Sequence, residues 1–319
     1  MDKSDTIYVA GHKGMVGSAI VRELREEGFD NLVLRSHSDL DLLDQEATFE
    51  FFEEEAPEYV ALAAAKVGGI MANDTYRAQF IYENIQIQNN VIHAAYENDV
   101  KKLIFLGSSC IYPKYAPQPI KEEHLLSGKL EDTNEPYAIA KIAGIKTCEN
   151  YYRQYGSNFY SVMPTNLYGP NDNFDLETSH VLPALLRKFY EAEAEDRDKV
   201  TLWGTGEPER EFMHVDDMAD AFVYLLEEVE AEDVYDKGIT HINIGTGKDL
   251  SINELAELIA HVVGYEGQIT HDLSKPDGTP KKLLDVSRLH ELGWEARIPL
   301  REGIKVTLDW YKKNYDKSE

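Results

Sequence analysis

The amino-acid sequence predicts an α/β protein in which a Rossmann-type, doubly wound parallel sheet is followed by a smaller mixed α/β domain. Short apolar strands alternate with amphipathic helices through the first half of the 319-residue chain. A glycine-rich turn joins the first strand to the first helix. Beyond Pro164, loops rich in Gly, Pro and Asn separate fewer and more scattered elements.

The first half is expected to repeat strand–helix–strand units. Residues 7–10 form a short apolar strand, after which Val16, Ile20 and Leu24 recur at the spacing of an amphipathic helix that ends at Gly28. Such units predict a parallel sheet with helices on both faces. The later strands are expected at residues 32–34, 59–63, 102–107 and 160–163, and the later helices at 45–55, 80–98 and 136–155.

The second half is expected to be less regular, with small strands between its helices. Its helices are expected at residues 181–193, 216–230 and 252–263, and its strands at 200–203 and 241–244. We therefore expect a first domain over residues 1–170, to which a segment near 210–240 returns. The second domain is expected over residues 171–319.

Acidic residues dominate the charge of the chain: 58 Asp and Glu stand against 32 Lys and Arg, a formal net charge of −26. A surface this negative repels nucleic acid and anionic lipid headgroups, so neither is expected as a partner. Two cysteines, Cys110 and Cys148, make no disulfide framework, and no metal-binding spacing occurs in the sequence. The polar N-terminus is unlike a signal peptide and the apolar runs are too short to span a bilayer, which predicts a cytoplasmic protein.

The glycine-rich loop between the first strand and the first helix predicts a dinucleotide site. Glycines there allow a tight turn, the close approach of backbone to a pyrophosphate, and helix–strand packing, while the helix N-terminus attracts the phosphates. The spacing is GxxGxxG, which is typical of extended short-chain dehydrogenases/reductases. The residues of the loop are Gly11, His12, Lys13, Gly14, Met15, Val16 and Gly17.

The residues after the second strand indicate which dinucleotide binds. That strand ends in Leu34, followed by Arg35, Ser36 and His37, and no carboxylate occurs before Asp39. A carboxylate at this point would accept a hydrogen bond from the ribose 2′-hydroxyl, whereas a cation accommodates a 2′-phosphate. The cation at position 35, together with the lysine of the glycine loop, therefore favours NADP(H).

A second glycine-containing segment, Gly245 to Lys248, is similar to a P-loop. It lacks both the earlier glycine and the following Ser or Thr that a P-loop requires. We therefore expect only a turn after a strand of the second domain.

Tyr137 and Lys141 predict a catalytic proton donor for a carbonyl oxygen. They lie four residues apart near the start of a helix, so they share one face of it, and Asn134 is placed to cap the helix. The ammonium and the positive helix end are expected to lower the pKa of the Tyr137 phenol toward that of a working proton donor. Ser108 follows a buried strand at the carboxyl edge of the sheet, where ligands bind, and can donate to the same carbonyl oxygen.

Longer segments carry a more specific resemblance. They cover residues 63–70, 106–114, 133–145, 163–170, 179–181, 210–217 and 275–280. Through these segments, essentially the whole chain resembles the GDP-L-fucose synthases. These extended short-chain dehydrogenases/reductases epimerise GDP-4-keto-6-deoxy-D-mannose at C3 and C5 and then reduce it at C4 with NADPH.

The resemblance implies a role for each catalytic residue. Ser108, Tyr137 and Lys141 correspond to the reductase triad, and Cys110 and His180 to the epimerisation. The chemistry supports this assignment, because protons at C3 and C5 are acidic beside the C4 ketone, and inversion needs a base on one face and an acid on the other. A thiolate and an imidazole titrate near neutral pH, so our hypothesis is Cys110 as base and His180 as acid.

The resemblance also implies the ligand contacts: an NADP-binding first domain and a mainly GDP-sugar-binding second domain. Beside the glycine loop, it assigns to the cofactor Arg35, His37, Asp41, Leu106, Gly107, Ser108, Ser109, Lys141, Pro164, Thr165, Asn166, Leu167 and His180. It assigns to the substrate Lys188, Trp203, Arg210 and Asp277, with Lys282 a weaker candidate. It further implies a homodimer, for which the helices 80–98 and 137–155 are the candidate interface.

Two residues depart from the pattern expected of these relatives. Lys188 stands where many have Arg, which keeps the charge but loses bidentate geometry. His37 stands where an Arg would hold the 2′-phosphate more firmly, so the preference for NADPH depends more on Lys13 and Arg35.

The alternative function is another extended-type nucleotide-sugar epimerase/reductase or dehydratase. A dehydratase would need an acid/base pair where Cys110 and Ile111 stand, and a 4-epimerase would not need Cys110 together with His180. A non-enzymatic NADP-sensing regulator on the same fold would commonly lose the Tyr137 and Lys141 pair, which is intact here.

Overall fold

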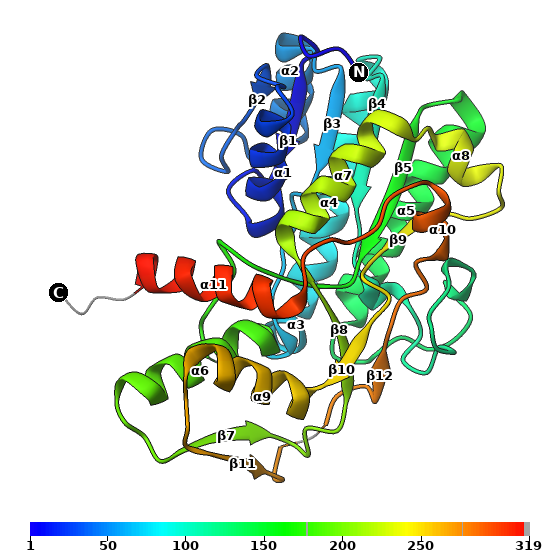
Figure 1. The fold of residues 1–319 in the computed structure, drawn as a ribbon. Coiled ribbons are helices and arrows are strands. Elements are labelled where there is room, and N and C mark those ends of the chain that lie inside the picture. Colours follow the sequence, from blue (N-terminus) through cyan, green and yellow to red (C-terminus); the bar gives the residue numbers. More distant parts are fainter. Residues whose placement is uncertain (177, 276, 316–319) are drawn as a thin grey trace.

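The computed structural model describes residues 1–176, 178–275 and 277–315. Its larger part is a six-stranded sheet in the order β2-β1-β3-β4-β5-β9, in which all neighbours are parallel (Figure 1). This sheet confirms the predicted fold class. Its strands are β1 (Ile7–Ala10), β2 (Leu32–Val33), β3 (Tyr59–Leu62), β4 (Lys102–Leu106), β5 (Phe159–Pro164) and β9 (Ile242–Ile244).

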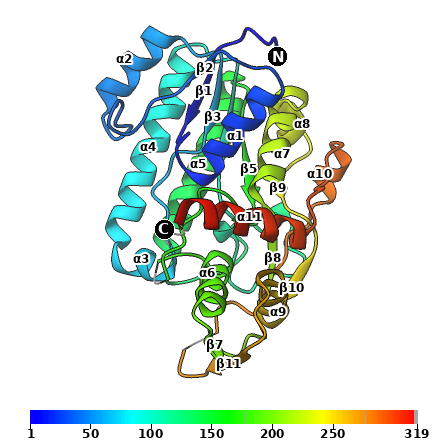
Figure 2. The same ribbon diagram turned by 60° about the vertical axis from the view of Figure 1, so that its left-hand side comes forward.

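Helices cover both faces of this sheet (Figure 2). Ile7 and Val9 of β1 are buried in the core that contains α1 and α7, whereas Tyr8 and Ala10 are buried in the core that contains α2, α4 and α5. This alternation follows from the two-residue period of a strand. The helices are α1 (Met15–Glu26) and α7 (Val215–Glu228) on one face, and α2 (Gln45–Glu55), α4 (Arg77–Glu97) and α5 (Glu135–Tyr155) on the other.

Strand β9 corrects one expectation. Residues 241–244 were expected as a small strand of the second domain, but Ile242–Ile244 pairs with β5 and completes the first sheet. Likewise, the turn at residues 245–247 wraps a carboxylate of the protein itself, since Thr246 N and Gly247 N donate to Glu211 Oε1 at 2.6 and 2.8 Å. The P-loop-like segment is therefore a turn whose N–H groups bind a buried carboxylate of the chain itself, and Gly247 and Lys248 at its end are exposed.

The smaller part lies at the lower end of the molecule in Figure 1. Its central strand is β8, which pairs antiparallel with β10 and parallel with both β12 and β6, while β7 and β11 form a separate parallel pair. Helices α6, α9 and α11 share its apolar core. The elements are β6 (Asn166–Tyr168), α6 (Val181–Ala194), β7 (Lys199–Trp203), β8 (Glu209–His214), β10 (Asp249–Ser251), α9 (Ile252–Val263), β11 (Gln268–Asp272), β12 (Lys281–Lys282) and α11 (Leu300–Tyr315).

Several elements of the smaller part are absent from the predicted set. Strands β6, β10 and β12 have two or three residues, too few to show a period in the sequence. The other unpredicted elements are β8, β11 and α11, with the short helices α3 (Ile70–Thr75), α8 (Ala231–Tyr235) and α10 (Ser287–Glu291) and the 3-10 turns at Ser109–Ile111 and Glu122–His124. The domain boundaries stay a prediction.

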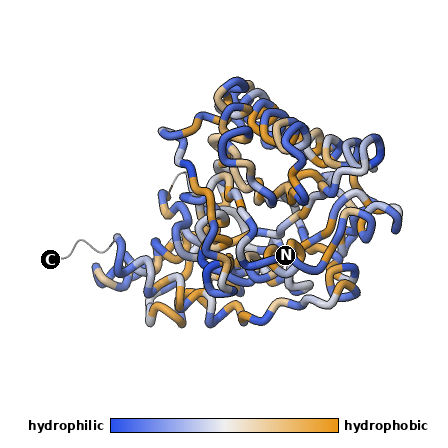
Figure 3. Tube along the Cα trace, turned by 90° about the horizontal axis from the view of Figure 1, so that it is seen from above, coloured by the Kyte–Doolittle hydropathy of each residue, from blue (hydrophilic) through white to orange (hydrophobic). Residues whose placement is uncertain are grey.

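Seen from above, apolar and hydrophilic residues alternate along the helices that enclose the sheet (Figure 3). This pattern is that of helices with one face in a core and one in water. Within the described ranges, none of the helices has the length and apolar character needed to cross a bilayer.

Candidate active site

A continuous cavity of about 1250 Å³ lies at the carboxyl ends of β1, β3, β4 and β5 and reaches the smaller part of the molecule. Open α/β sheets bind ligands at this edge. Every residue expected to contact the cofactor, the substrate or the reacting atoms lines the cavity. Segments as far apart in the sequence as Gly11 and Lys282 therefore face the same space, although their individual roles stay predictions.

The glycine loop fits a dinucleotide pyrophosphate. Gly11 has a φ of +85°, and a Cβ on it would lie 2.8 Å from the backbone N of Ala64; a Cβ on Gly17 would lie 2.2 Å from the Gly11 carbonyl O. The packing of the loop therefore requires both glycines. A Cβ on Gly14 would meet its nearest protein atom only at 3.4 Å, so the space beside Gly14 is left open on the cavity side.

The start of α1 offers hydrogen-bond donors to an anion. Gly14 precedes the helix and supplies no side-chain cap, so the N–H groups of the first turn have no side-chain acceptor there. His12 Nδ1, also in the loop, is buried and has no hydrogen-bond partner among the described residues. Free N–H groups at a helix N-terminus attract phosphate, so the chain's own residues fit the predicted cofactor.

Positive charge lies where the 2′-phosphate is expected. Arg35 is half-buried, pairs with Glu55 on α2 and has its guanidinium 5.8 Å from the centroid of the Phe51 ring. Lys13 is exposed at the same end of the cavity. One carboxylate of α2 thus holds Arg35 in place while a second cation remains beside it.

The nearest carboxylate is already engaged. Asp39 Oδ2 accepts hydrogen bonds from the hydroxyl and, at 3.1 Å, the backbone N of Ser36, and these bonds lower the pKa of Asp39. His37 is exposed, with its Nδ1 3.6 Å from Asp41 Oδ1. The loop therefore presents no unengaged carboxylate at the position that would distinguish NAD, which supports the expectation drawn from Arg35.

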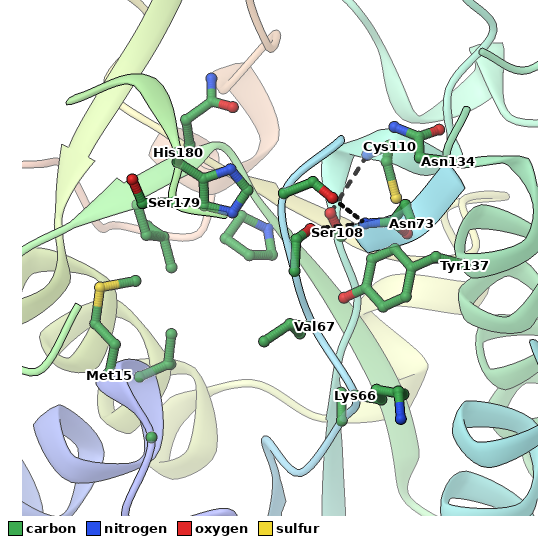
Figure 4. A pocket seen from close by; sticks show the side chains of 18 of the residues that line it. Met15, Lys66, Val67, Asn73, Ser108, Cys110, Asn134, Tyr137, Ser179 and His180 are labelled. Atoms are coloured by element: carbon green, nitrogen blue, oxygen red, sulfur yellow. Dashed lines mark hydrogen bonds between the residues drawn. The ribbon is translucent and has the colours of Figure 1, made fainter. Parts of the chain in front are cut away.

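Ser108, Tyr137 and Lys141 meet in the middle of the cavity, from the end of β4 and the first two turns of α5. Lys141 Nζ donates to the Leu106 carbonyl O at 2.8 Å and lies 5.8 Å from the centroid of the Tyr137 ring. The hydroxyl of Tyr137 and the side chain of Ser108 point into the same space (Figure 4). A carbonyl oxygen in that space could accept from both hydroxyls.

The expected lowering of the Tyr137 pKa is wrong. Burial raises the pKa of the Tyr137 phenol, and the same burial lowers the pKa of Lys141 to about 8. Desolvation disfavours the charged form of each group, and Cys110 adds to the rise at Tyr137, while the Lys141 ammonium donates to the Leu106 carbonyl. Tyr137 therefore stays protonated, which is the form that a proton donor needs.

Asn134 stands at the N-cap position of α5, as expected, but its side chain does not cap the helix. Its side chain makes no cap hydrogen bond, and α5 begins with Glu135 and a proline in its first turn. Asn134 Oδ1 is instead buried without a hydrogen-bond partner in the described part of the chain, and the side chain lines the cavity beside Cys110. No group of the described chain therefore satisfies this amide oxygen.

Cys110 and His180 reach the cavity from two sides (Figure 4). Cys110 follows Ser108 in a 3-10 turn and is 9% exposed; burial raises the pKa of its thiol, and Lys282 acts most strongly against that rise. His180 precedes α6 and its side chain is accessible from the cavity. The protein that surrounds this part of the cavity desolvates the imidazole and lowers its pKa, and Lys282 lowers it further. A base and an acid on two sides of one space are the geometry that inversion of a carbon centre requires.

The loop after β3 joins the two halves of the site. Gly69 N donates to the carbonyl O of Thr178 at 3.1 Å, on the segment that carries Ser179 and His180. Asn73 Nδ2 fixes the same loop by donating to the Gly68 and Gly69 carbonyls at 2.6 and 3.1 Å. The loop of the larger part thus contacts the segment that positions the proposed acid.

The far end of the cavity carries an exposed indole between two cations. The Nζ atoms of Lys188 and Lys275 each lie 5.1 Å from the Trp203 ring centroid, and Trp203 is 53% exposed. Asp277 accepts from Thr205 N and Oγ1, both at 2.9 Å. An aromatic face next to a fixed carboxylate suits a nucleobase with N–H donors.

Some residues that line or border the cavity were missed by sequence reasoning. Ser179 and Lys275 belong to resembling segments and Asn73 lies three residues beyond another, but none of the three has a spacing that marks a function. Asn134 was noticed only as a cap. Pro276, within the predicted 275–280 segment, lies outside the described residues.

Taken together, a glycine loop at a helix N-terminus and a Ser, Tyr and Lys set in one cavity define a nucleotide-dependent oxidoreductase of the Rossmann type. The NAD dependent epimerase/dehydratase family matches residues 7–245, and the chain belongs to this family. The chain is therefore a member of an enzyme family with an NAD(P) site, as the fold and the glycine loop indicate.

Full-length relatives narrow the comparison. The chain is 60% identical over 313 residues to GDP-L-fucose synthase 1 of Arabidopsis thaliana, covering 98% of this chain and 95% of that protein. It is 58% identical over 314 residues to the GDP-L-fucose synthase of Escherichia coli K12, covering 98% of each. A GDP-mannoheptose C4 reductase from Campylobacter jejuni, solved with NADP bound, superposes with a TM-score of 0.90 at 45% identity, over 98% of this chain and 99% of that one.

Proposed function

We propose that the protein converts GDP-4-keto-6-deoxy-D-mannose to GDP-L-fucose by epimerisation at C3 and C5 and NADPH-dependent reduction at C4. The observation that carries the proposal is the presence of Cys110 and His180 in the same cavity as Ser108, Tyr137 and Lys141. A simple reductase needs only Ser108, Tyr137 and Lys141. Cys110 and His180 add the base and the acid for inversion.

Epimerisation begins when the Cys110 thiolate removes a proton from the carbon next to the ketone. The resulting enolate oxygen accepts hydrogen bonds from the hydroxyls of Tyr137 and Ser108, which stabilise the developing charge. His180 then delivers a proton to the other face of the same carbon. The Cys110 thiol releases to water in the cavity the proton that it took up, and the step repeats at the second carbon. The open position of His180 allows it to regain a proton from water in the cavity.

Reduction uses the same two hydroxyls. NADPH, when bound, supplies the hydride to C4. Tyr137 gives its proton to the oxygen as the ketone becomes an alcohol, and Ser108 holds that oxygen in place. The Lys141 ammonium, oriented by the Leu106 carbonyl, lies beside the phenol ring and stabilises negative charge there. Burial keeps bulk water from this step, since Lys141 is 3% exposed.

The GDP moiety is assigned to the far end of the cavity. Trp203 stacks with the base, Asp277 accepts from its N–H groups, and Lys188 and Arg210 meet the diphosphate. Burial lowers the pKa of Arg210, but its guanidinium stays charged at neutral pH. The diphosphate would give it an anionic partner. These cations are scarce in a chain of net charge −26, so their concentration in one cavity supports an anionic ligand.

Deuterium exchange in heavy water tests the assignment of roles. Cys110→Ser is expected to stop exchange at C3 and C5 of the ketone yet still reduce an already epimerised ketone. Tyr137→Phe is expected to lose reduction far more than exchange. Undiminished exchange in Cys110→Ser would show that the thiol is not the base, and an enzyme that reduces without any exchange would be a reductase only.

The cofactor preference has its own test. Lys13 and Arg35, with the carboxylate of Asp39 occupied by Ser36, support NADPH over NADH. Comparing kcat/KM for the two cofactors at fixed substrate is expected to favour NADPH, and Lys13→Met is expected to reduce that ratio. An equal ratio in the wild type would overturn the preference.

A homodimer through α4 and α5 completes the proposal. These two helices pack against each other and leave large side chains exposed on their outer surface: Tyr82 is 65%, Tyr155 is 51% and Ile139 is 41% exposed. Gel filtration with light scattering is expected to give twice the 36.3 kDa mass of the chain. A mass of one chain would contradict it.

A further inference from the structure

Strand β12 consists of two lysines with opposite surroundings. It pairs with Glu209 and Arg210 of β8, and its side chains alternate between the two faces of the strand. Lys281 Nζ forms ion pairs with Glu209 at 2.6 Å and Asp249 at 2.7 Å. Lys282 lines the cavity, and its ammonium has neither a hydrogen-bond acceptor nor an ion-pair partner within the described ranges.

The backbone around Lys282 is held from both sides. Leu284 N donates to Glu211 Oε2 at 3.0 Å, and Leu283 N donates to Gln118 Oε1 at 2.9 Å. Ile120 N in turn donates to the Leu283 carbonyl O at 2.7 Å. Because these hydrogen bonds fix the backbone next to Lys282, the fold determines the position of its unpaired ammonium.

Lys282 and Cys110 line the same two cavities, and Lys282 affects the pKa of the Cys110 thiol. Both residues line the main cavity, and both also line a small adjoining cavity of about 50 Å³ behind the thiol. Lys282 has the largest electrostatic effect on Cys110 of any charged side chain, and it acts on His180 as well. Its own charged neighbours are Arg210 and Glu211 of β8.

The other charged or titratable groups around Cys110 are occupied or neutral. Lys141 of α5 gives a hydrogen bond to the Leu106 carbonyl, and Tyr137 of the same helix stays protonated. Among the described residues, two other cations line the small cavity, and both are paired: Lys114 with Glu131, with 3.7 Å between Nζ and Oε1, and Lys281 with Glu209 and Asp249. His180 lies across the main cavity. Lys282 therefore remains as the unpaired cation at the thiol.

We propose that Lys282 is the counter-ion of the Cys110 thiolate, a positioning residue for epimerisation rather than a ligand of the GDP diphosphate. The inference rests on the proposed function and deepens it. When the thiol loses its proton, the ammonium stabilises the sulfur anion in a site that otherwise disfavours charge. The thiolate then removes a sugar proton, becomes a thiol again, and Lys282 stays protonated throughout.

The two possible roles of Lys282 make different kinetic predictions. If Lys282 binds the diphosphate, it contacts the substrate in both reactions. Its loss would then raise KM in epimerisation and in reduction alike. A counter-ion of the thiolate would affect proton removal alone. Its loss would lower kcat for exchange and leave KM and the reduction of an already epimerised ketone unchanged.

The experiment compares Lys282→Met with Lys281→Met, the matched control on the same strand. The first readout is alkylation of Cys110 by iodoacetamide across pH in the full-length protein, followed by peptide mass spectrometry; Cys148, which is 0% exposed, serves as the internal reference. Lys282→Met is expected to slow alkylation at pH 7 about tenfold, the effect of raising the thiol pKa by one unit. Lys281→Met is expected to match the wild type, and Lys282→Arg to restore most of the rate.

The second readout is deuterium exchange at C3 and C5, expected to fall about tenfold in Lys282→Met while reduction stays within twofold of the wild type. An unchanged alkylation profile with a raised KM in both reactions would overturn the proposal in favour of a diphosphate ligand. Equal losses in Lys281→Met would overturn it by showing that the strand alone matters. If Lys282→Met does not fold, Lys282→Gln carries the same comparison. If the wild type shows no exchange, the proposed function fails, while the alkylation comparison still decides the effect of Lys282 on the thiol.

Discussion

Replacing Gly17 by alanine tests the packing of the glycine loop against α1. The added Cβ would lie 2.2 Å from the Gly11 carbonyl O and 2.6 Å from its carbonyl carbon, where an ordinary contact begins at 3.4 Å. The helix must therefore move by about 1 Å, and overpacking of this kind costs about 1–3 kcal/mol. The shift carries the first turn of α1 away from the position in which its N–H groups can bind a pyrophosphate.

Gly14→Ala is the matched control, because its Cβ would contact Gly11 O only at 3.4 Å. We expect Gly17→Ala to lose several degrees of melting temperature, at about 2–4 °C per kcal/mol for a domain of this size, and at least tenfold in NADPH affinity. Gly14→Ala is expected to keep its melting temperature but to lose affinity, since its methyl group enters the ligand side of the loop. The measurements are thermal melts followed by circular dichroism and NADPH titrations followed by fluorescence. An unchanged melting temperature and affinity in Gly17→Ala would refute the packing argument.

Three further predictions concern pH and salt. Burial lowers the pKa of Lys141 to about 8, so kcat/KM for reduction should fall above that pH as the ammonium is lost; a profile that stays level well beyond it would contradict the role of the charge. Burial lowers the pKa of His241 to about 3. Between about pH 6.5 and pH 3, His241 is therefore protonated in the unfolded chain and neutral in the folded chain. The free energy of unfolding should then fall by about 1.4 kcal/mol per pH unit from this group, a slope that His241→Asn should remove in urea titrations. Finally, a net charge of −26 predicts a higher melting temperature in molar salt than in dilute buffer, and equal values would argue against self-repulsion.

Much of the larger sheet could be predicted because its signals are local. The strand at Ile7–Ala10 and the helix 45–55 were expected within the same residues that the structure assigns to β1 and α2. The failures are also informative. Residues 241–244 were given to the second domain because a short apolar strand carries no mark of its partner, and only the pairing of β9 with β5 decides its sheet.

The candidate site follows the same division. Gly11, Tyr137 and Ser108 were placed by motifs whose spacing reflects one turn or one helix face. Asn134 was misread as a side-chain cap because the sequence does not show that its side chain lines the cavity instead of bonding the first turn of α5. The direction of the Tyr137 pKa was also wrong, since spacing reveals the nearby lysine but not the desolvation that dominates.

The sequence by itself determined the family, the dinucleotide loop and the identity of the reactive side chains, because each depends on residues that are near neighbours along the chain. Only the tertiary structure decided how those residues are charged and what surrounds them. The pairing of β12 with β8 brings Lys282 to Cys110 across more than half the sequence, and burial sets the protonation of Tyr137 and Lys141. Desolvation and long-range charge depend on distance in space, which the order of residues along a chain does not reveal.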